Sequence, residues 1–162
     1  MCAIGALRAI GVLGLLTAAL AGCEGVTTGT EVARMQLQAA EGGSYAPVKV
    51  TLATEMNPVA INFRADFSQN PSECGKWNTY SVALSKDGNV VASRNIDINH
   101  PQSQSQAGAD APPRASTIYT LFIINIQASG EYELTLSALQ PPAITLSSPT
   151  VDVRRNVQRP PQ

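Results

Sequence analysis

Apolar and polar residues alternate with a period of two along most of this chain, a pattern typical of β-strands with one buried face. The clearest run is 59–67, where odd positions are apolar and even positions are mostly polar. Shorter alternating runs cover 35–39, 48–52 and 77–84. We therefore expect four strands here, with the odd residues of 59–67 facing a core and the even residues facing water.

Turn residues separate further strands in the second half of the chain. Asp87 and Gly88 tolerate the positive φ angles of a tight hairpin turn, so residues 90–98 should return beside the preceding strand. Residues 118–126 are apolar at nearly every position, which predicts a central strand covered on both faces. The remaining strands are expected in two segments, 132–138 and 144–153.

About eight strands and no convincing helix predict an all-β fold, an antiparallel β-sandwich of seven to nine strands. Trp77 opens one strand, a Lys86–Asn89 hairpin follows, and a turn with a tyrosine occurs at 128–134. In this order the chain resembles an immunoglobulin-like domain. A small closed β-barrel is the structural alternative.

The first 23 residues have the composition of an export signal. Arg8 precedes the apolar stretch 9–20, and small residues lead to Cys23. Leu20, Ala21, Gly22 and Cys23 resemble the lipobox of bacterial lipoproteins. The resemblance implies cleavage before Cys23 and attachment of diacylglycerol and a further acyl chain such as palmitate to that cysteine.

This resemblance predicts the domain organisation of the chain and its location in the cell. Residues 1–22 are expected to be a signal peptide, 23–31 a lipidated tether, 32–153 the sandwich domain and 154–162 a disordered basic tail. Two or three acyl chains anchor a protein stably to a membrane surface. Because the residue after the cysteine is glutamate rather than aspartate, the resemblance favours the periplasmic side of the outer membrane in a Gram-negative cell.

The mature chain carries little net charge. The sequence has 11 basic and 12 acidic residues, and residues 1–22 contain only one of them, Arg8, which leaves 10 basic and 12 acidic residues. Such a balance does not predict nucleic-acid binding, which is marked by a basic patch. Cys23 and Cys74 remain after cleavage, and with Cys23 acylated we expect no internal disulfide.

No residue pattern predicts catalysis, a metal site or a cofactor. The only histidine, His100, precedes a polar segment that contains Ser103 and Ser105, and we expect a solvated loop histidine rather than a catalytic triad. Asn95, Asp97 and Asn99 alternate but lack the glycine and glutamate of a calcium loop. The pair Glu131 and Glu133 and the basic residues 154, 155 and 159 are expected to be solvated.

The expected function is a non-enzymatic binding or assembly module held in the cell envelope by its lipid. The partner would be an envelope protein or a cell-wall component besides the membrane itself. Two loops are the candidate binding sites, 68–76 beside Trp77 and 99–115 with Asn99 and His100. The alternatives are an inhibitor or immunity-type lipoprotein against an envelope-attacking enzyme and, less favoured, an envelope hydrolase.

Overall fold

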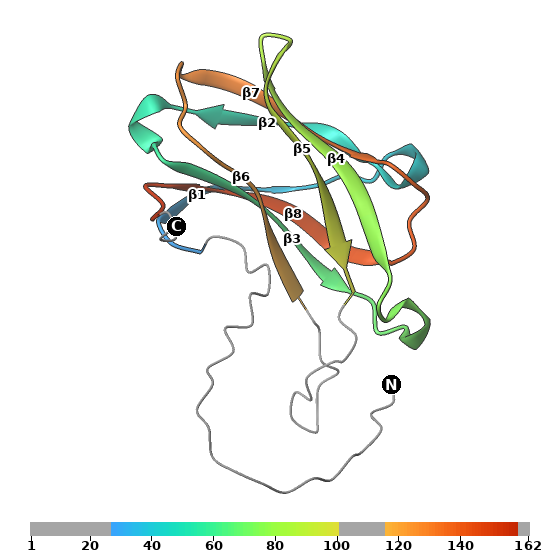
Figure 1. Cartoon of the computed structure of the whole chain (residues 1–162). Helices are drawn as coiled ribbons and strands as arrows, with labels where there is room; N and C mark the ends of the chain where they lie inside the picture. Colours follow the sequence, from blue (N-terminus) through green and yellow to red (C-terminus); the bar gives the residue numbers. More distant parts are fainter. Residues whose placement is uncertain (1–26, 101–115, 159–162) are drawn as a thin grey trace, which may run out of the picture.

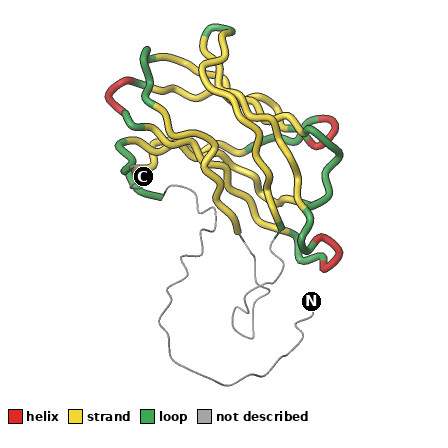
Figure 2. Tube along the Cα trace, in the orientation of Figure 1, coloured by secondary structure: helices red, strands yellow, loops and turns green. Residues whose placement is uncertain are grey.

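The structure is a computed structural model that describes residues 27–100 and 116–158. Strands form more than half of this part of the chain, and its helical segments are three short 3-10 turns (Figures 1 and 2). The strands are β1 (Thr30–Gln36), β2 (Tyr45–Leu52), β3 (Val59–Phe67), β4 (Trp77–Lys86), β5 (Asn89–Asn99), β6 (Ser116–Ile124), β7 (Gly130–Ala138) and β8 (Leu146–Arg155). The 3-10 turns are η1 (Glu41–Gly43), η2 (Thr54–Met56) and η3 (Pro71–Glu73).

The strands form two four-stranded antiparallel sheets that pack face to face. One sheet, here sheet A, has the order β1-β8-β3-β6, and the other, sheet B, has the order β2-β7-β4-β5. The predicted antiparallel sandwich and the predicted number of strands are therefore confirmed. The sheets are not closed into the alternative small barrel.

The connectivity differs from that of the immunoglobulin-like domain used as a guide. In an immunoglobulin domain the first two strands share a sheet, whereas β1 and β2 lie in different sheets. The observed order is that of an eight-stranded jelly roll. One local feature of the resemblance is nevertheless present, because the Tyr132 hydroxyl donates to the Ala128 carbonyl oxygen over 2.6 Å, as in a tyrosine corner.

The core lies between the sheets and is built from the alternating positions of the strands. Val59, Ile61 and Phe63 of β3 are fully buried, as predicted. The even positions of β3 differ from the expectation, because Ala60 and Asn62 are also fully buried. β3 is a central strand between β8 and β6, so side chains of both neighbours flank its outer face.

β6 occupies a position that its sequence did not predict. The apolar character of 118–126 suggested a central strand, yet β6 is the edge of sheet A and pairs only with β3 in the described residues. Four of its side chains, at 117–120, and those of Ile123 and Ile124 are only half-buried. The sequence shows how apolar a strand is, but it does not show which strands lie beside it in the sheet.

The folded unit extends beyond its predicted ends. β1 begins at Thr30, inside the expected tether, and Arg154 donates to the carbonyl oxygens of Thr28 and Gly29 over 2.8 and 3.0 Å. At the other end β8 continues to Arg155 and Val157 is buried, so residues 154–158 belong to the sandwich. The predicted signal, the lipobox and the last four residues lie outside the described part.

Candidate functional site

The two sheets leave their edge strands unpaired on the same side of the sandwich. β5 is hydrogen-bonded only to β4, and β6 only to β3, within the described residues. Near the ends of the two strands the Asn99 N–H donates to the Tyr119 hydroxyl over 2.9 Å. The strands are tied at this point, and a groove opens between them further along.

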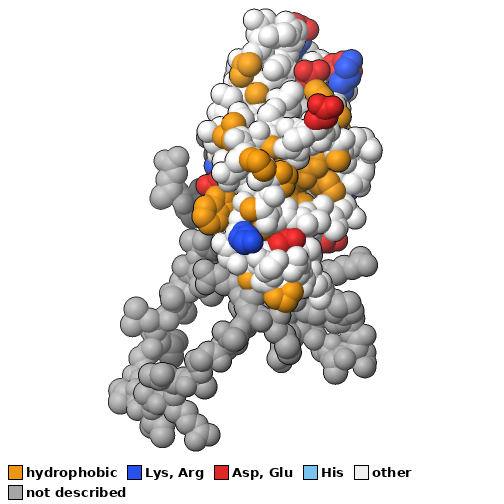
Figure 3. All heavy atoms as spheres, turned by 90° about the vertical axis from the view of Figure 1, so that its right-hand side faces the viewer, with side chains coloured by type: hydrophobic (Ala, Val, Ile, Leu, Met, Phe, Trp, Pro, Cys, Tyr) orange, Lys and Arg blue, Asp and Glu red, His pale blue; other side chains and the backbone are white. Residues whose placement is uncertain are grey.

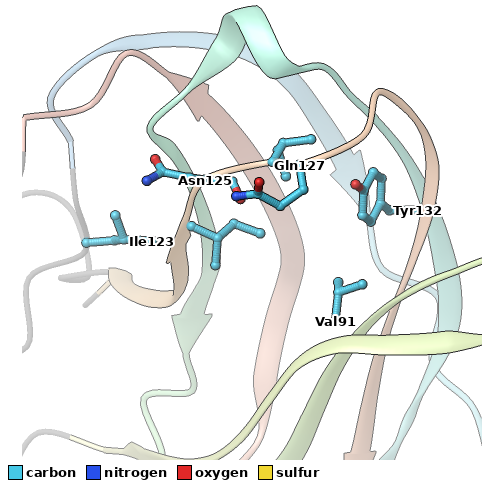
Figure 4. Close-up of a pocket in the computed structure, with 7 residues that line it drawn as sticks. Val91, Ile123, Asn125, Gln127 and Tyr132 are labelled. Carbon is cyan, nitrogen blue, oxygen red and sulfur yellow. The ribbon is translucent and has the colours of Figure 1, made fainter.

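This opening, which we call the seam groove, has a volume of about 370 Å³ (Figure 4). A volume of this size is at the lower end of the range for ligand sites, which suits a short segment rather than a bulky ligand. In Figure 4, Val91 rises from β5 below Tyr132 on one side of the groove, and Ile123 and Asn125 lie on the other side. The lining residues are Val91, Ile123, Ile124, Asn125, Ile126, Gln127 and Tyr132.

An irregularity in β5 sets the position of Val91 at the groove. Leu84 pairs with Ala92 and Ser85 pairs with Val90, so Val91 is an extra residue without a cross-strand partner. A bulge of this kind bends a strand and redirects a side chain. Val91 is 51% exposed and lines the groove instead of packing on β4.

The loop between β6 and β7, which forms the other wall, is held in place by side chains. Asn57 brackets Ile126, because its amide nitrogen donates to the Ile126 carbonyl over 2.9 Å and its oxygen accepts from the Ile126 N–H over 2.6 Å. The Thr54 N–H donates to the Ser129 hydroxyl over 3.1 Å. Together with the Tyr132 corner, these bonds fix the wall before any ligand arrives, which lowers the entropic cost of binding.

The chemistry of the groove is apolar with neutral polar edges. Among the described residues, those that line it include no carboxylate, histidine, lysine or arginine. Asn125 and Gln127 are exposed and supply amide donors and acceptors, while Ile126 and Tyr132 are buried at its base. Such a surface suits a largely neutral ligand and offers no general acid or base.

Three residues predicted from sequence as binding candidates meet at one place, away from the groove. Trp77 is the cross-strand partner of Asn99, and the His100 N–H donates to the Lys76 carbonyl over 2.8 Å. Trp77 is 48% exposed, at the start of β4. Figure 3 shows the right-hand side of the molecule in Figure 1, where hydrophobic side chains form separate groups and charged ones are few.

The prediction that His100 is solvated is wrong, since it is only 2% exposed. Its Nε2 lies 2.9 Å from the Ser68 carbonyl oxygen, and its ring centroid lies 5.0 Å from that of Phe67. The nearby Asp97 on β5 accepts from the Thr79 hydroxyl over 2.7 Å. Ser103 and Ser105 lie outside the described residues. His100 holds two segments of chain together in this arrangement.

Glu73 is a buried carboxylate beside His100 that sequence analysis did not identify. One of its oxygens accepts from the Ser68 hydroxyl and from the Thr145 N–H, both over 2.7 Å, and the other accepts from the Thr145 hydroxyl over 3.0 Å. Burial by itself raises the pKa of Glu73, but these hydrogen bonds and the nearby His100 outweigh it, so the pKa is lowered. Glu73 therefore stays ionised and fastens the chain that leads into β8.

Asn78 fastens the same segment from the other side. Its side-chain oxygen accepts from the N–H groups of Ala143 and Ile144 over 2.7 and 3.0 Å, and its nitrogen donates to the Ile144 carbonyl over 3.0 Å. We call the set Ser68, Glu73, Asn78, His100 and residues 143–145 the polar lock. The side chains of Glu73, Asn78 and His100 in this set all form hydrogen bonds with backbone groups of other segments.

Arg64 of β3 belongs to a cluster of charged side chains on the outer side of sheet A. It donates to both oxygens of Asp152 over 3.2 and 3.3 Å, and Asp152 is fully buried on the outer side of sheet A. Arg154 lies 3.8 Å from the same carboxylate. A bidentate arginine and a second cation compensate the buried charge, so this cluster has a structural explanation.

The remaining acidic candidates lie on the surface. Glu131 and Glu133 are exposed, as predicted, and Glu131 forms a 2.7 Å ion pair with Lys49 across the sheet. Asn95, Asp97 and Asn99 are exposed on β5. Among residues 27–100 and 116–158, no group of three His, Cys, Asp or Glu side chains is placed to bind a metal ion.

Cys74 corrects a further expectation. It is half-buried and takes part in a disulfide, although none was predicted. It is the only cysteine in the described ranges, so its partner lies outside them, and the other cysteines of the chain are Cys2 and Cys23. A sulfur that carries a lipid cannot form a disulfide, so acylation of Cys23 and its pairing with Cys74 are mutually exclusive.

Sequence reasoning missed the groove because its walls are far apart in the chain. Val91 belongs to one hairpin and residues 123–127 to a segment after the next connection. The only signal was the unusual apolar character of 118–126, and it was interpreted as the mark of a covered central strand. Exposed apolar residues on both edge strands become visible only when the strand order is known.

Comparison with known proteins adds no functional assignment. No protein-family model matches the chain, and no curated protein or solved structure shows significant similarity to it. The part of the chain that the structure describes contains no helix with the length and hydrophobicity needed to cross a membrane.

Proposed function

We propose that this chain is a lipid-anchored cell-envelope protein that acts as a non-enzymatic binding or assembly module. The anchor rests on the resemblance of Leu20–Cys23 to a lipobox. The binding role rests on one observation above all, the seam groove between two unpaired strand edges. Unpaired edges and apolar grooves are recurrent sites of peptide and protein recognition.

The position of the groove relative to the start of the domain supports this combination. Glu31 at the start of β1 pairs with Arg154, Arg154 pairs with Ala60, and Ala60 pairs with Ile123 of β6. This row crosses sheet A, so the start of β1 and the groove lie at the same end of the strands. Their separation is three strand spacings, roughly 14 Å.

The link between the anchor and the domain would be short. Thr28 already contacts the fold, since its hydroxyl accepts from the Gln158 N–H over 3.1 Å. Thr28 lies five positions after Cys23, and an extended chain spans at most about 18 Å over five positions. An acylated Cys23 would therefore hold the groove close to the membrane, within reach of other proteins on that surface.

The anchor is tested by mass spectrometry of protein isolated from membranes. We expect a first residue Cys23 that carries diacylglycerol and an acyl chain. Cys23→Ala should abolish acylation and release the chain from the membrane fraction. Mature protein with an unprocessed N-terminus, or with Cys23 bonded to Cys74, would overturn the anchoring.

The binding role is tested by isolating the protein from envelope membranes in mild detergent and identifying what accompanies it. Val91→Arg places a charge in the groove, and Val32→Arg is the matched control, because Val32 is 38% exposed on the opposite edge. We expect Val91→Arg to reduce recovery of the same partner at least fivefold and Val32→Arg to leave it unchanged. Equal recovery with both variants would contradict the proposal.

A further inference from the structure

We propose that the seam groove receives an extended peptide segment of a partner protein, with an apolar side chain in the groove and a carboxylate paired with Arg94. This inference rests on the proposed binding function and names the class of its ligand. Three features carry it: the composition of β6, the amide groups at the rim, and the direction of Arg94.

The composition of β6 does not suit its position. Its sequence, STIYTLFII, is apolar on both faces, yet it forms a sheet edge whose last residues are half-buried. In an antiparallel pair, alternate residues direct their N–H and C=O groups away from the neighbouring strand. The outer edge of β6 thus offers backbone hydrogen bonds beside apolar side chains, which is what an added strand uses.

The polar groups around the opening match a peptide backbone. Asn125 and Gln127 flank the apolar base formed by Ile126 and Tyr132. An amide side chain offers both donors and an acceptor, as a peptide unit does. An extended peptide alternates its side chains, so one apolar residue can enter the groove while its backbone meets the rim.

Arg94 supplies the charge that selects among such peptides. It pairs with Val82, which is fully buried, and paired residues of neighbouring strands point to the same face of a sheet. Arg94 therefore projects toward the seam, on the same side of β5 as the buried Ile96. It has no ion pair within the described ranges and is exposed, so a carboxylate of a ligand can reach it.

The separation of Arg94 from the groove defines the peptide. Val91 and Arg94 are three residues apart on β5, which corresponds to about 10 Å. A peptide that lies along the seam would cover this distance in about three residues. We therefore expect the carboxylate two to four positions from the apolar residue that enters the groove.

A partner peptide explains the seam better than a second copy of this chain. Two copies joined symmetrically along β5 and β6 would bring their Arg94 side chains to the same interface, where like charges repel.

The test uses the full chain in detergent and labelled eight-residue peptides. Each peptide has threonine at most positions, one central leucine, and a glutamate two, three or four residues away. The matched peptides carry glutamine instead of glutamate. Fluorescence anisotropy measures affinity, and hydrogen exchange reports which backbone amides become protected.

We expect at least one glutamate peptide to bind about fivefold more tightly than its glutamine counterpart, a preference that weakens at high salt. Arg94→Ala should remove the preference, whereas Arg155→Ala, at an exposed arginine at the end of β8, should keep it. Amides between 122 and 127 should become protected when the peptide binds.

Two results would overturn the inference. No peptide binding, or binding that ignores both glutamate and Arg94, would remove the proposed ligand class. A concentration-dependent dimer protected at β6, measured by light scattering without peptide, would assign the seam to a second copy. If peptides fail while Val91→Arg still prevents recovery of an envelope partner, the binding role stands and only the extended-peptide ligand is lost.

Discussion

The polar lock and the seam groove lie in different parts of the sandwich and use opposite kinds of residue. The lock holds the histidine, a buried carboxylate and a buried amide, and each of them is committed to hydrogen bonds within the fold. The described residues that line the groove are apolar or neutral, and they leave apolar surface and strand edges accessible. The residue types that often carry out chemistry thus have a structural role in the polar lock, and the accessible surface of the seam groove is formed by apolar and amide residues.

This contrast predicts that substitutions in the lock reduce stability, whereas substitutions at the groove surface reduce binding. The largest effect is expected for Asn78→Ala. It removes the acceptor for two backbone N–H groups and the donor to one carbonyl, so we expect a loss of about 3 kcal/mol in the free energy of unfolding. Chemical denaturation measures this loss.

The matched control is Asn95→Ala, which alters an exposed asparagine on β5 and should change stability by less than about 0.5 kcal/mol. A similar effect of the two substitutions would show that the lock does not stabilise the fold as described.

Glu73→Gln should have the next largest effect. Removing the charge weakens three hydrogen bonds, and we expect a loss of about 1.5 kcal/mol at pH 7. Because folding lowers the pKa of Glu73, its contribution is present above the ordinary glutamate pKa of 4.5 and is lost as the pH falls through the lower folded value.

Denaturation midpoints of the wild type and Glu73→Gln should therefore differ by a constant amount well above the ordinary glutamate pKa of 4.5 and converge as the pH falls below that value and through the lower folded pKa. A difference that grows as the pH falls would mean that the carboxylate is not stabilised by its partners.

Tyr132→Phe probes a residue that contributes both to the core and to the groove. It keeps the ring but removes the hydroxyl bond to Ala128, so we expect a loss of about 1 kcal/mol. Hydrogen exchange should become faster in residues 125–129, because the corner helps to fix this wall. Unchanged exchange there would show that Asn57 alone holds the loop.

Val91→Arg should have the smallest effect on stability and a large effect on binding. Val91 is half-exposed and has no cross-strand partner, so the free energy of unfolding should change by less than about 0.5 kcal/mol. Loss of partner recovery without loss of stability would sharpen the contrast with Asn78→Ala. Substantial unfolding would mean that Val91 belongs to the core.

The sequence predicted the local parts of this fold well. The alternation of 59–67 matches β3 from its first residue to its last, and the turn at Asp87 and Gly88, whose φ angles are 51° and 79°, joins β4 to β5. These features depend on neighbouring residues only. The period of two and the turn residues contain the information directly.

The errors concern contacts between distant segments. The edge position of β6 depends on the strand order, and the burial of His100 depends on Phe67 and Ser68, more than 30 residues earlier. The groove likewise combines Val91 with residues after β6. An apolar pattern indicates that a strand is buried, and polar neighbours suggest that a residue is exposed. Neither pattern identifies the distant segment that packs against the strand or the residue.

Photo-crosslinking in intact cells tests the central claim, that the chain binds its partner at the seam groove, most directly. A photoreactive phenylalanine analogue is placed at position 91 in the groove or at position 77, where the exposed tryptophan begins β4 beside the lock. The account predicts a discrete adduct with one envelope protein from position 91 and none from position 77. Adducts from position 77 alone would move the binding surface to the region of the lock and contradict the account.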